Sequence, residues 1–170
     1  MAKTGLVIDV IGTAPDAENG YNIAFRSELD ALIMPEYNDL RYRSITNAAH
    51  MCGHDGHMAN LLGTARILTN HLDKIPRNCK VRFVFQPAEE EYGGALPMIE
   101  EGVLEGIDEI FAIHVFPGAD IDKIGIIEGP VSTQSSDFKI DIHGKGGHGA
   151  FPWLCDDVIL CASEMVAALN

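Results

Sequence analysis

Residues 81–90 decide the fold, and they read VRFVFQPAEE. The run from Val81 to Phe85 alternates basic and apolar residues at its start, as a short strand does, and it leads directly into two adjacent glutamates. In parallel α/β sheets, active sites gather at the carboxyl ends of the strands. Glu89 and Glu90 therefore stand where the sequence predicts a site.

Outward from this stretch, short β-branched runs alternate with helical patterns, which indicates an α/β fold with a largely parallel sheet flanked by helices. The predicted strands are Gly5–Ile11, Asn22–Leu29, Val81–Phe85, Ile110–Val115 as a buried strand, and Asp137–His143 as a half-exposed one. The predicted helices are Gly56–Leu72, Leu96–Glu101 and Val158–Leu169. The change of character after Gly129-Pro130 places a domain boundary near Ser136.

We therefore expect a partial catalytic domain in residues 1–135 and the beginning of a smaller α+β lid domain in residues 136–170. The second segment holds too few residues to fold alone, so the chain is expected to be a fragment.

The composition narrows the function classes. The chain has 170 residues, 46% of them hydrophobic and 22% charged, which is typical of a soluble globular protein. A net charge of −13 argues against nucleic-acid binding, which needs clustered basic residues. No apolar run approaches the roughly 18 residues of a membrane helix, and Met1–Gly5 lacks a signal-peptide core. Four cysteines without disulfide spacing favour a reducing, cytoplasmic setting.

Residues 52–57, CGHDGH, form the strongest local motif. A thiolate and an imidazole two residues apart can reach one metal centre from a tight turn, and Gly53 lets the backbone bend between Cys52 and His54. Asp55 could orient an imidazole from behind. The alternative is a loop cysteine beside surface histidines.

Two further motifs follow strands. Of the adjacent carboxylates Glu89 and Glu90, one can bind a metal while the other takes a proton from water, although Glu91 also allows a solvated acidic run. His114 ends an apolar strand, where a lone histidine is more often a core residue than a ligand. The co-occurrence of three such clusters at consecutive element boundaries favours a metal centre.

Five motifs occur in the order of one family: RSELDAL at 26–32, HMCGHDGH at 50–57, QPAEE at 86–90, HVFP at 114–117 and GGHGA at 146–150. The chain resembles the metal-dependent amidohydrolase/carboxypeptidase family, which includes N-acyl-amino-acid amidohydrolases, hippurate hydrolase and indole-acetyl-amino-acid hydrolases. The resemblance implies a zinc-exopeptidase-like catalytic domain that hydrolyses the amide bond of N-acyl amino acids or related small amides.

The resemblance also implies the roles of individual residues. The implied metal ligands are Cys52, His54, Glu90 and His114, with the thiolate shared between two divalent cations. Glu89 is the implied general base that activates the attacking water. His148 matches a lid-domain histidine that polarises the substrate carbonyl, often across a dimer, although it could equally be a turn residue in a glycine-rich hairpin.

Other matched positions are implied to be supporting residues: Arg26, Glu28, Asp30, Asp55 and His57, while His50 has no assigned role. Glu28 stands where relatives commonly have Asp, and Trp153 where many have His, with Cys155 in the same variable stretch. Relatives carry a further ligand histidine far downstream, beyond Asn170.

The expected cofactors are two divalent metal ions, zinc or manganese, with nickel also compatible. The expected partners are a small N-acyl amino acid substrate and, for the full-length protein, a second copy in a homodimer, but neither nucleic acid nor a membrane. Two alternatives remain open: a catalytically inert metal-binding fragment, and a dipeptide-cleaving metallo-exopeptidase.

Overall fold

The computed structural model describes residues 1–91, 93–133, 136 and 138–169. The chain divides into two compact units, Met1–Ile121 and Asp122–Asn170, which are described separately below. This division falls earlier in the chain than the domain boundary expected between residues 135 and 136, which stays a prediction.

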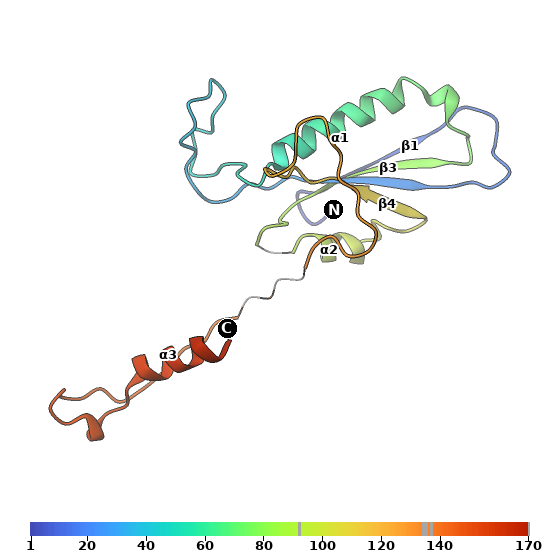
Figure 1. The fold of residues 1–170 in the computed structure, drawn as a ribbon. Helices are drawn as coiled ribbons and strands as arrows, with labels where there is room; N and C mark the ends of the chain where they lie inside the picture. Colours follow the sequence, from blue (N-terminus) through green and yellow to red (C-terminus); the bar gives the residue numbers. More distant parts are fainter. Residues whose placement is uncertain (92, 134–135, 137, 170) are drawn as a thin grey trace. The chain divides into compact units, whose positions relative to one another are not determined.

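The first unit is built on a four-stranded sheet in the order β1-β3-β2-β4 (Figure 1). Its strands are β1 (Leu6–Ile11), β2 (Ile23–Glu28), β3 (Lys80–Gln86) and β4 (Glu109–Ala112). β2 runs parallel to both β3 and β4, whereas β1 pairs antiparallel with β3. The prediction of an α/β fold with a largely parallel sheet is confirmed, with β1 as the antiparallel strand.

Helices cover both faces of the sheet because β3 is apolar on both sides. Val81, Phe83 and Phe85 pack with Leu61 of α1 (His54–Thr69) on one face. On the other face Val84 packs with Met98 of α2 (Ala95–Glu100). Figure 1 shows α1 and α2 on opposite sides of the sheet. This three-layer packing holds the strand ends and the start of α1 in one place.

The basic residue at the start of β3 has a structural role. Arg82 donates from Nε and Nη2 to the two carboxylate oxygens of Asp9 on β1, each at 2.7 Å, and from Nη1 to the Val103 carbonyl at 2.7 Å. The hydrogen bond from Arg82 lowers the pKa of Asp9 below its ordinary value, despite the opposing effect of burial. The pair ties the antiparallel strand to the parallel part of the sheet.

Two strand predictions need correction. Ile110–Val115 was expected to be a buried strand, but β4 covers only Glu109–Ala112 and leaves Ile110 48% exposed, because it is an edge strand with only β2 beside it. The expected strand Asp137–His143 does not form in residues 138–143, since no strand of the described chain pairs with them, and Asp137 lies outside the described residues.

The helix predictions agree well with the structure. α1 begins at His54, two residues before the expected Gly56, and ends at Thr69, followed by a 3-10 turn (Leu72–Lys74). In the second unit α3 spans Val158–Leu169 as predicted, after a 3-10 turn at Pro152–Leu154. None of the helices in the described residues is long and apolar enough to cross a membrane.

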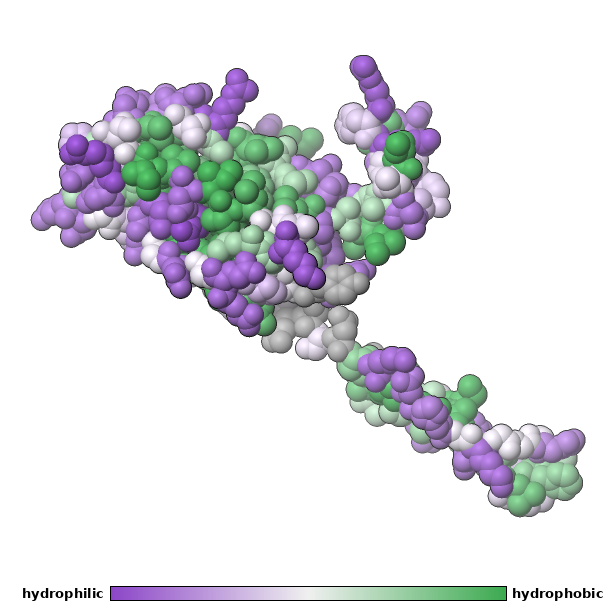
Figure 2. Space-filling model, turned by 180° about the vertical axis from the view of Figure 1, so that it is seen from behind, coloured by the Kyte–Doolittle hydropathy of each residue, from purple (hydrophilic) through white to green (hydrophobic). Residues whose placement is uncertain are grey.

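Apolar side chains are exposed on the larger unit, and Figure 2 shows apolar residues in green gathered on one of its faces. Exposed apolar residues occur on both edge strands, for example Leu6 and Ile8 on β1 and Phe111 on β4. All four cysteines are free thiols in this structure.

Candidate metal centre

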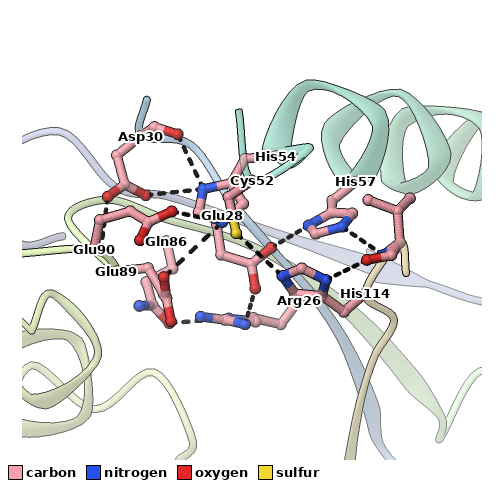
Figure 3. A network of polar contacts seen from close by, with 11 residues as sticks. Arg26, Glu28, Asp30, Cys52, His54, His57, Gln86, Glu89, Glu90 and His114 are labelled. Carbon is pink, nitrogen blue, oxygen red and sulfur yellow. Dashed lines mark hydrogen bonds and ion pairs between the residues drawn. The ribbon is translucent and has the colours of Figure 1, made fainter. Parts of the chain in front are cut away.

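The predicted site residues of the first unit converge at one edge of the sheet (Figure 3). β2 ends at Glu28, just before Asp30; β3 ends shortly before Glu89 and Glu90; β4 ends just before His114. The carboxyl ends of parallel strands meet at the same edge, so loops that follow different strands become neighbours. Cys52 and His54 come to this edge from the start of α1.

The first group of donor atoms comprises His54, Glu89 and Glu90, whose ligand atoms all lie within 4.8 Å of one another. His54 Nε2 is 3.7 Å from Glu90 Oε1 and 3.9 Å from Glu89 Oε2. The second group comprises Cys52, His54 and His114, again within 4.8 Å. The two groups share His54, and we call the five residues Cys52, His54, Glu89, Glu90 and His114 the open cluster.

The protonation of His54 follows from its neighbours. Its Nδ1–H donates to the Asp30 carbonyl oxygen at 2.9 Å, and a carbonyl can only accept. In the neutral ring Nε2 therefore carries a lone pair, directed towards the carboxylates of Glu89 and Glu90. The His54 side chain is only 1% exposed, and neither its Nε2 nor Glu90 Oε1 has a hydrogen-bond partner in the described chain.

Buried polar atoms that lack partners are rare and costly in folded proteins. Here a nitrogen lone pair and carboxylate oxygens face one another, and a cation is the group that would satisfy all of them at once. The set of sulfur, nitrogen and oxygen donors suits a divalent transition metal. The residues therefore fit the metal ions that the motifs predict.

Asp30 supports the open cluster from behind. Its Oδ2 accepts a hydrogen bond from the Glu90 backbone N–H at 2.9 Å, while its Oδ1 lies 3.3 Å from His54 Nδ1. Burial raises the pKa of Asp30, but the backbone N–H groups of Glu90 and Glu89 and the proximity of His54 outweigh it, so the pKa is lowered overall. Asp30 thus stays an anion and holds both His54 and the Glu90 loop.

Gly53 gives the turn between Cys52 and His54 its shape. It adopts a left-handed conformation with φ of 85°, which side chains other than glycine rarely adopt. A Cβ atom at this position would also lie 2.4 Å from Cγ2 of Val115, the residue after His114. The predicted bend at Gly53 is confirmed, and the turn is in contact with the loop that carries His114.

Cys52 Sγ lies 3.4 Å from Nε2 of His114, which can only accept because His114 Nδ1–H is directed at the Val115 carbonyl at 2.7 Å. Burial raises the pKa of Cys52 to about 11, assisted by a hydrogen bond with Glu90 and by the negative charges of Glu90, Glu89 and Glu28. The metal-free thiol is therefore protonated at neutral pH. A divalent cation would reverse this balance, because metal ligation needs the thiolate.

His57 lies one turn after His54 on α1 but is fully engaged. Its Nδ1–H donates to Glu28 Oε2 at 2.8 Å, and its Nε2 accepts the Val115 backbone N–H at 2.9 Å. Although Glu28, His54 and His57 form a third group of potential donor atoms, His57 has no free nitrogen to offer a metal. The supporting role that the resemblance implies for His57 stays a prediction.

Glu28 continues this supporting arrangement. Its Oε1 pairs with Arg26, whose Nε donates to Gln86 Oε1 at 3.0 Å. Burial raises the pKa of Glu28, but hydrogen bonds from its own backbone and His57 and the charge of Arg26 lower it overall. We call Arg26, Glu28, His57 and Gln86 the closed network, because the partners of its charged groups all lie within it or on the backbone.

Three other predicted residues belong to neither the open cluster nor the closed network. Asp55 was expected to orient an imidazole, but its Oδ1 accepts the Gly56 N–H at 2.9 Å instead, and the orienting groups are Asp30 and Glu28. His148 belongs to the second unit, where its Nδ1 accepts the Ala150 N–H at 3.1 Å. Its catalytic role stays a prediction. His50 contributes a buried Nδ1 without a partner in the described chain.

Two hydrogen-bonding groups of this region were not predicted from the sequence. They are the side chain of Gln86, which binds Arg26, and the backbone N–H of Val115, which binds His57. Gln86 is the first residue of the QPAEE motif and the last residue of β3, and its place at that strand end could have marked it. No residue pattern could have marked Val115, because a backbone amide is common to nearly every residue.

Comparison with known proteins supports the family that the sequence motifs predict. The chain is 40% identical to an N-acyl-L-amino acid amidohydrolase of Geobacillus stearothermophilus and 39% identical to thermostable carboxypeptidase 1 of Saccharolobus solfataricus. These alignments cover 99% and 97% of this chain but only 44% and 42% of the relatives, so the chain spans less than half their length.

A solved structure, the YXEP protein of Bacillus subtilis, superposes with a TM-score of 0.68 at 39% identity over 75% of this chain and 34% of that one. It is described as a dinuclear metal binding peptidase from the M20 family. The family model for peptidase family M20/M25/M40 matches residues 24–170. The chain therefore belongs to peptidase family M20/M25/M40, which confirms the family that its motifs predicted.

Proposed function

We propose that the protein hydrolyses the amide bond of N-acyl amino acids or related small amides at the open cluster, with the help of two divalent cations held by four of its five residues. The observation that carries this proposal is the buried lone pair of His54 Nε2, which faces the carboxylates of Glu89 and Glu90 without a partner in the described chain. The relatives named as amidohydrolases and the dinuclear solved structure support it.

The residues that would hold the two ions are Cys52, His54, Glu90 and His114. Zinc and manganese are the expected metals, and nickel is compatible with the same donors. When bound, divalent cations would lower the pKa of a coordinated water and polarise the scissile carbonyl.

The exposure of the two glutamates supports a division of labour. The Glu90 side chain is 21% exposed and its backbone is held by Asp30, whereas Glu89 is 42% exposed. A ligand needs a fixed position, but a proton-transferring group needs access to both water and substrate. Glu89 is therefore the proposed general base, which accepts a proton from the attacking water and delivers it to the leaving amine.

His148 is proposed as the residue that polarises the substrate carbonyl from the lid. A polarising group must donate a hydrogen bond, and His148 Nδ1 accepts from Ala150 N–H, so any proton of the neutral ring is on Nε2. Nε2 is thus the nitrogen available to a carbonyl oxygen. A homodimer of the full-length protein and a cytoplasmic setting belong to the same proposal.

Substitution of the base tests this mechanism. Glu89→Gln keeps the size of the side chain but removes its basicity, so metal content should stay unchanged while hydrolysis of an N-acetyl amino acid falls by about 10² or more. The matched control is Glu91→Gln, an exposed neighbour outside the open cluster, which should keep both properties. Turnover by Glu89→Gln at the level of the parent protein would reject the assigned base.

Hydrolysis by the 170-residue chain alone decides between a functional enzyme and an inert metal-binding fragment. Elemental analysis of the purified chain together with an N-acetyl amino acid assay separates the two. Metal without turnover would support the inert fragment, and steady turnover would exclude it.

A dipeptide-cleaving exopeptidase is a second candidate, because a relative of nearly equal identity is named thermostable carboxypeptidase 1. Both reactions hydrolyse an amide close to a carboxylate, so the same open cluster serves either. A panel of N-acetyl amino acids against dipeptides of the same residues, compared by kcat/KM, would distinguish them.

A further inference from the structure

We propose that His57 and Glu28 are positioning residues that hold Val115 against the Cys52-Gly53-His54 turn. Through Val115 they determine where the His114 ring lies and which of its nitrogens carries the proton. This inference rests on the proposed metal centre. It assigns a purpose to the closed network, which the proposed mechanism does not otherwise use.

The backbone N–H and the backbone carbonyl of Val115 are both hydrogen-bonded to histidines. Its N–H donates to His57 Nε2 at 2.9 Å, and its carbonyl accepts from Nδ1–H of His114 at 2.7 Å. The second bond places the His114 proton on Nδ1 and leaves Nε2 free, directed at Cys52 Sγ at 3.4 Å. The nitrogen that His114 offers to a metal is therefore determined by the Val115 backbone.

The Val115 side chain provides a further point of attachment. Its Cγ2 occupies the space where a Cβ of residue 53 would stand, only 2.4 Å away. Because Gly53 lies between Cys52 and His54, this contact joins the His114 loop to the turn that carries the other donors. Hydrogen bonding to His57 and packing on Gly53 together fix the distance between His114 and Cys52.

A backbone N–H can only donate, so the hydrogen bond from Val115 requires the His57 tautomer that has a lone pair on Nε2 and its proton on Nδ1. The Glu28 carboxylate, 3% exposed, accepts the proton-bearing Nδ1 of His57 at 2.8 Å and so selects that tautomer. Arg26 balances the charge of Glu28. The chain of contacts thus runs from Arg26 through Glu28 and His57 to the Val115 backbone.

Two substitutions test whether His57 acts through its hydrogen bond to Val115 or only fills space. His57→Phe keeps the ring but cannot accept a hydrogen bond, whereas the side-chain oxygen of His57→Gln can still accept the Val115 N–H. The control is His71→Phe, an exposed histidine in the turn that follows α1. Far-UV circular dichroism verifies that each variant folds.

The first measurement is hydrogen exchange at the Val115 amide of the metal-free chain, followed by NMR. We expect exchange to accelerate about tenfold in His57→Phe and to change little in His57→Gln and His71→Phe. The ¹⁵N signals of His114 should show the Nδ1–H tautomer in the parent and a mixture in His57→Phe. If His57 only filled space, His57→Phe would change neither the exchange rate of the Val115 amide nor the ¹⁵N signals of His114.

The second measurement is titration with Co²⁺, followed by its thiolate charge-transfer absorption. We expect His57→Phe to weaken Co²⁺ binding by about 10- to 100-fold, as the loss of supporting residues commonly does, with partial rescue in His57→Gln. If either the Co²⁺ affinity or the exchange rate of the Val115 amide were unchanged in His57→Phe, the positioning role would be wrong, but the proposed metal centre would still stand. A parent chain that binds no Co²⁺ would overturn the metal centre itself, and the inference with it.

If His57→Phe does not fold, Glu28→Gln replaces it in both measurements. This variant keeps an acceptor for His57 Nδ1–H but lacks the charge that favours that tautomer, so faster Val115 exchange and weaker Co²⁺ binding are expected in smaller measure. Parent-like values for both would contradict the inference.

Discussion

The open cluster and the closed network lie side by side at the start of α1, and each contains histidine and glutamate, yet they differ in how these polar atoms are satisfied (Figure 3). In the closed network, His57 uses both ring nitrogens and Glu28 both carboxylate oxygens. In the open cluster, His54 Nε2 and Glu90 Oε1 have no partner in the described chain. The comparison shows that a carboxylate and an imidazole in contact do not by themselves make a metal site.

The largest expected effect is on metal binding. His54→Phe removes the donor common to both groups of ligand atoms, so Co²⁺ affinity should fall by about 100-fold or more, given about 10–16 kcal/mol shared among four ligands of a typical zinc site. This exceeds the loss expected from His57→Phe. Equilibrium titration of both variants with Co²⁺ measures the two losses of affinity. Equal losses would mean that the open cluster and the closed network do not differ in metal binding.

The order should reverse for stability without metal. His57→Phe leaves the buried Glu28 carboxylate without one partner, which should lower the free energy of unfolding by about 3 kcal/mol. His54→Phe removes the Nε2 atom that had no partner and one neutral hydrogen bond, from Nδ1–H to the Asp30 carbonyl, so its cost should be about 1 to 2 kcal/mol. Urea unfolding in the presence of a chelator measures both. A greater loss in His54→Phe would mean that the metal-free open cluster is already satisfied.

A third expectation concerns the contact that joins the two regions. Gly53→Ala places a Cβ against Val115 and forces alanine into positive φ, which should destabilise the chain by about 2 kcal/mol. Val115→Ala in the same chain removes the clash but not the backbone strain, so about half of the loss should return. The coupling in this double-mutant cycle is measured by urea unfolding, and additive effects would contradict the contact.

The smallest effect is expected at an ion pair remote from both regions. The folded pKa of Asp9 is lowered by Arg82, so the pair stabilises the fold above the ordinary aspartate pKa near 3.8, and this contribution is lost as pH falls through the lower folded value. Because Asp9 is 35% exposed, the effect should stay below about 1 kcal/mol. Urea midpoints of the parent and Asp9→Asn should differ at pH 5 and converge near pH 2.

Prediction from sequence succeeded where an element had partners in the same chain. β3 alternates between two apolar faces, and both faces are covered, by α1 and α2. The alternation of Phe138, Ile140 and Ile142 is equally regular, but no described strand pairs with it, and no strand forms. A pattern states which faces a strand would have, whereas formation of the strand needs backbone partners.

The sequence by itself determined the donor chemistry and its convergence. Glu90 and His114 follow parallel strands, which end at one edge of the sheet, whereas the meeting of Cys52 and His54 with them was expected from the resemblance of the motifs. Only the tertiary structure decided which histidine is open and which is closed. That distinction depends on a carbonyl of Asp30 and an amide of Val115, and backbone groups carry no residue-specific signal until the fold places them.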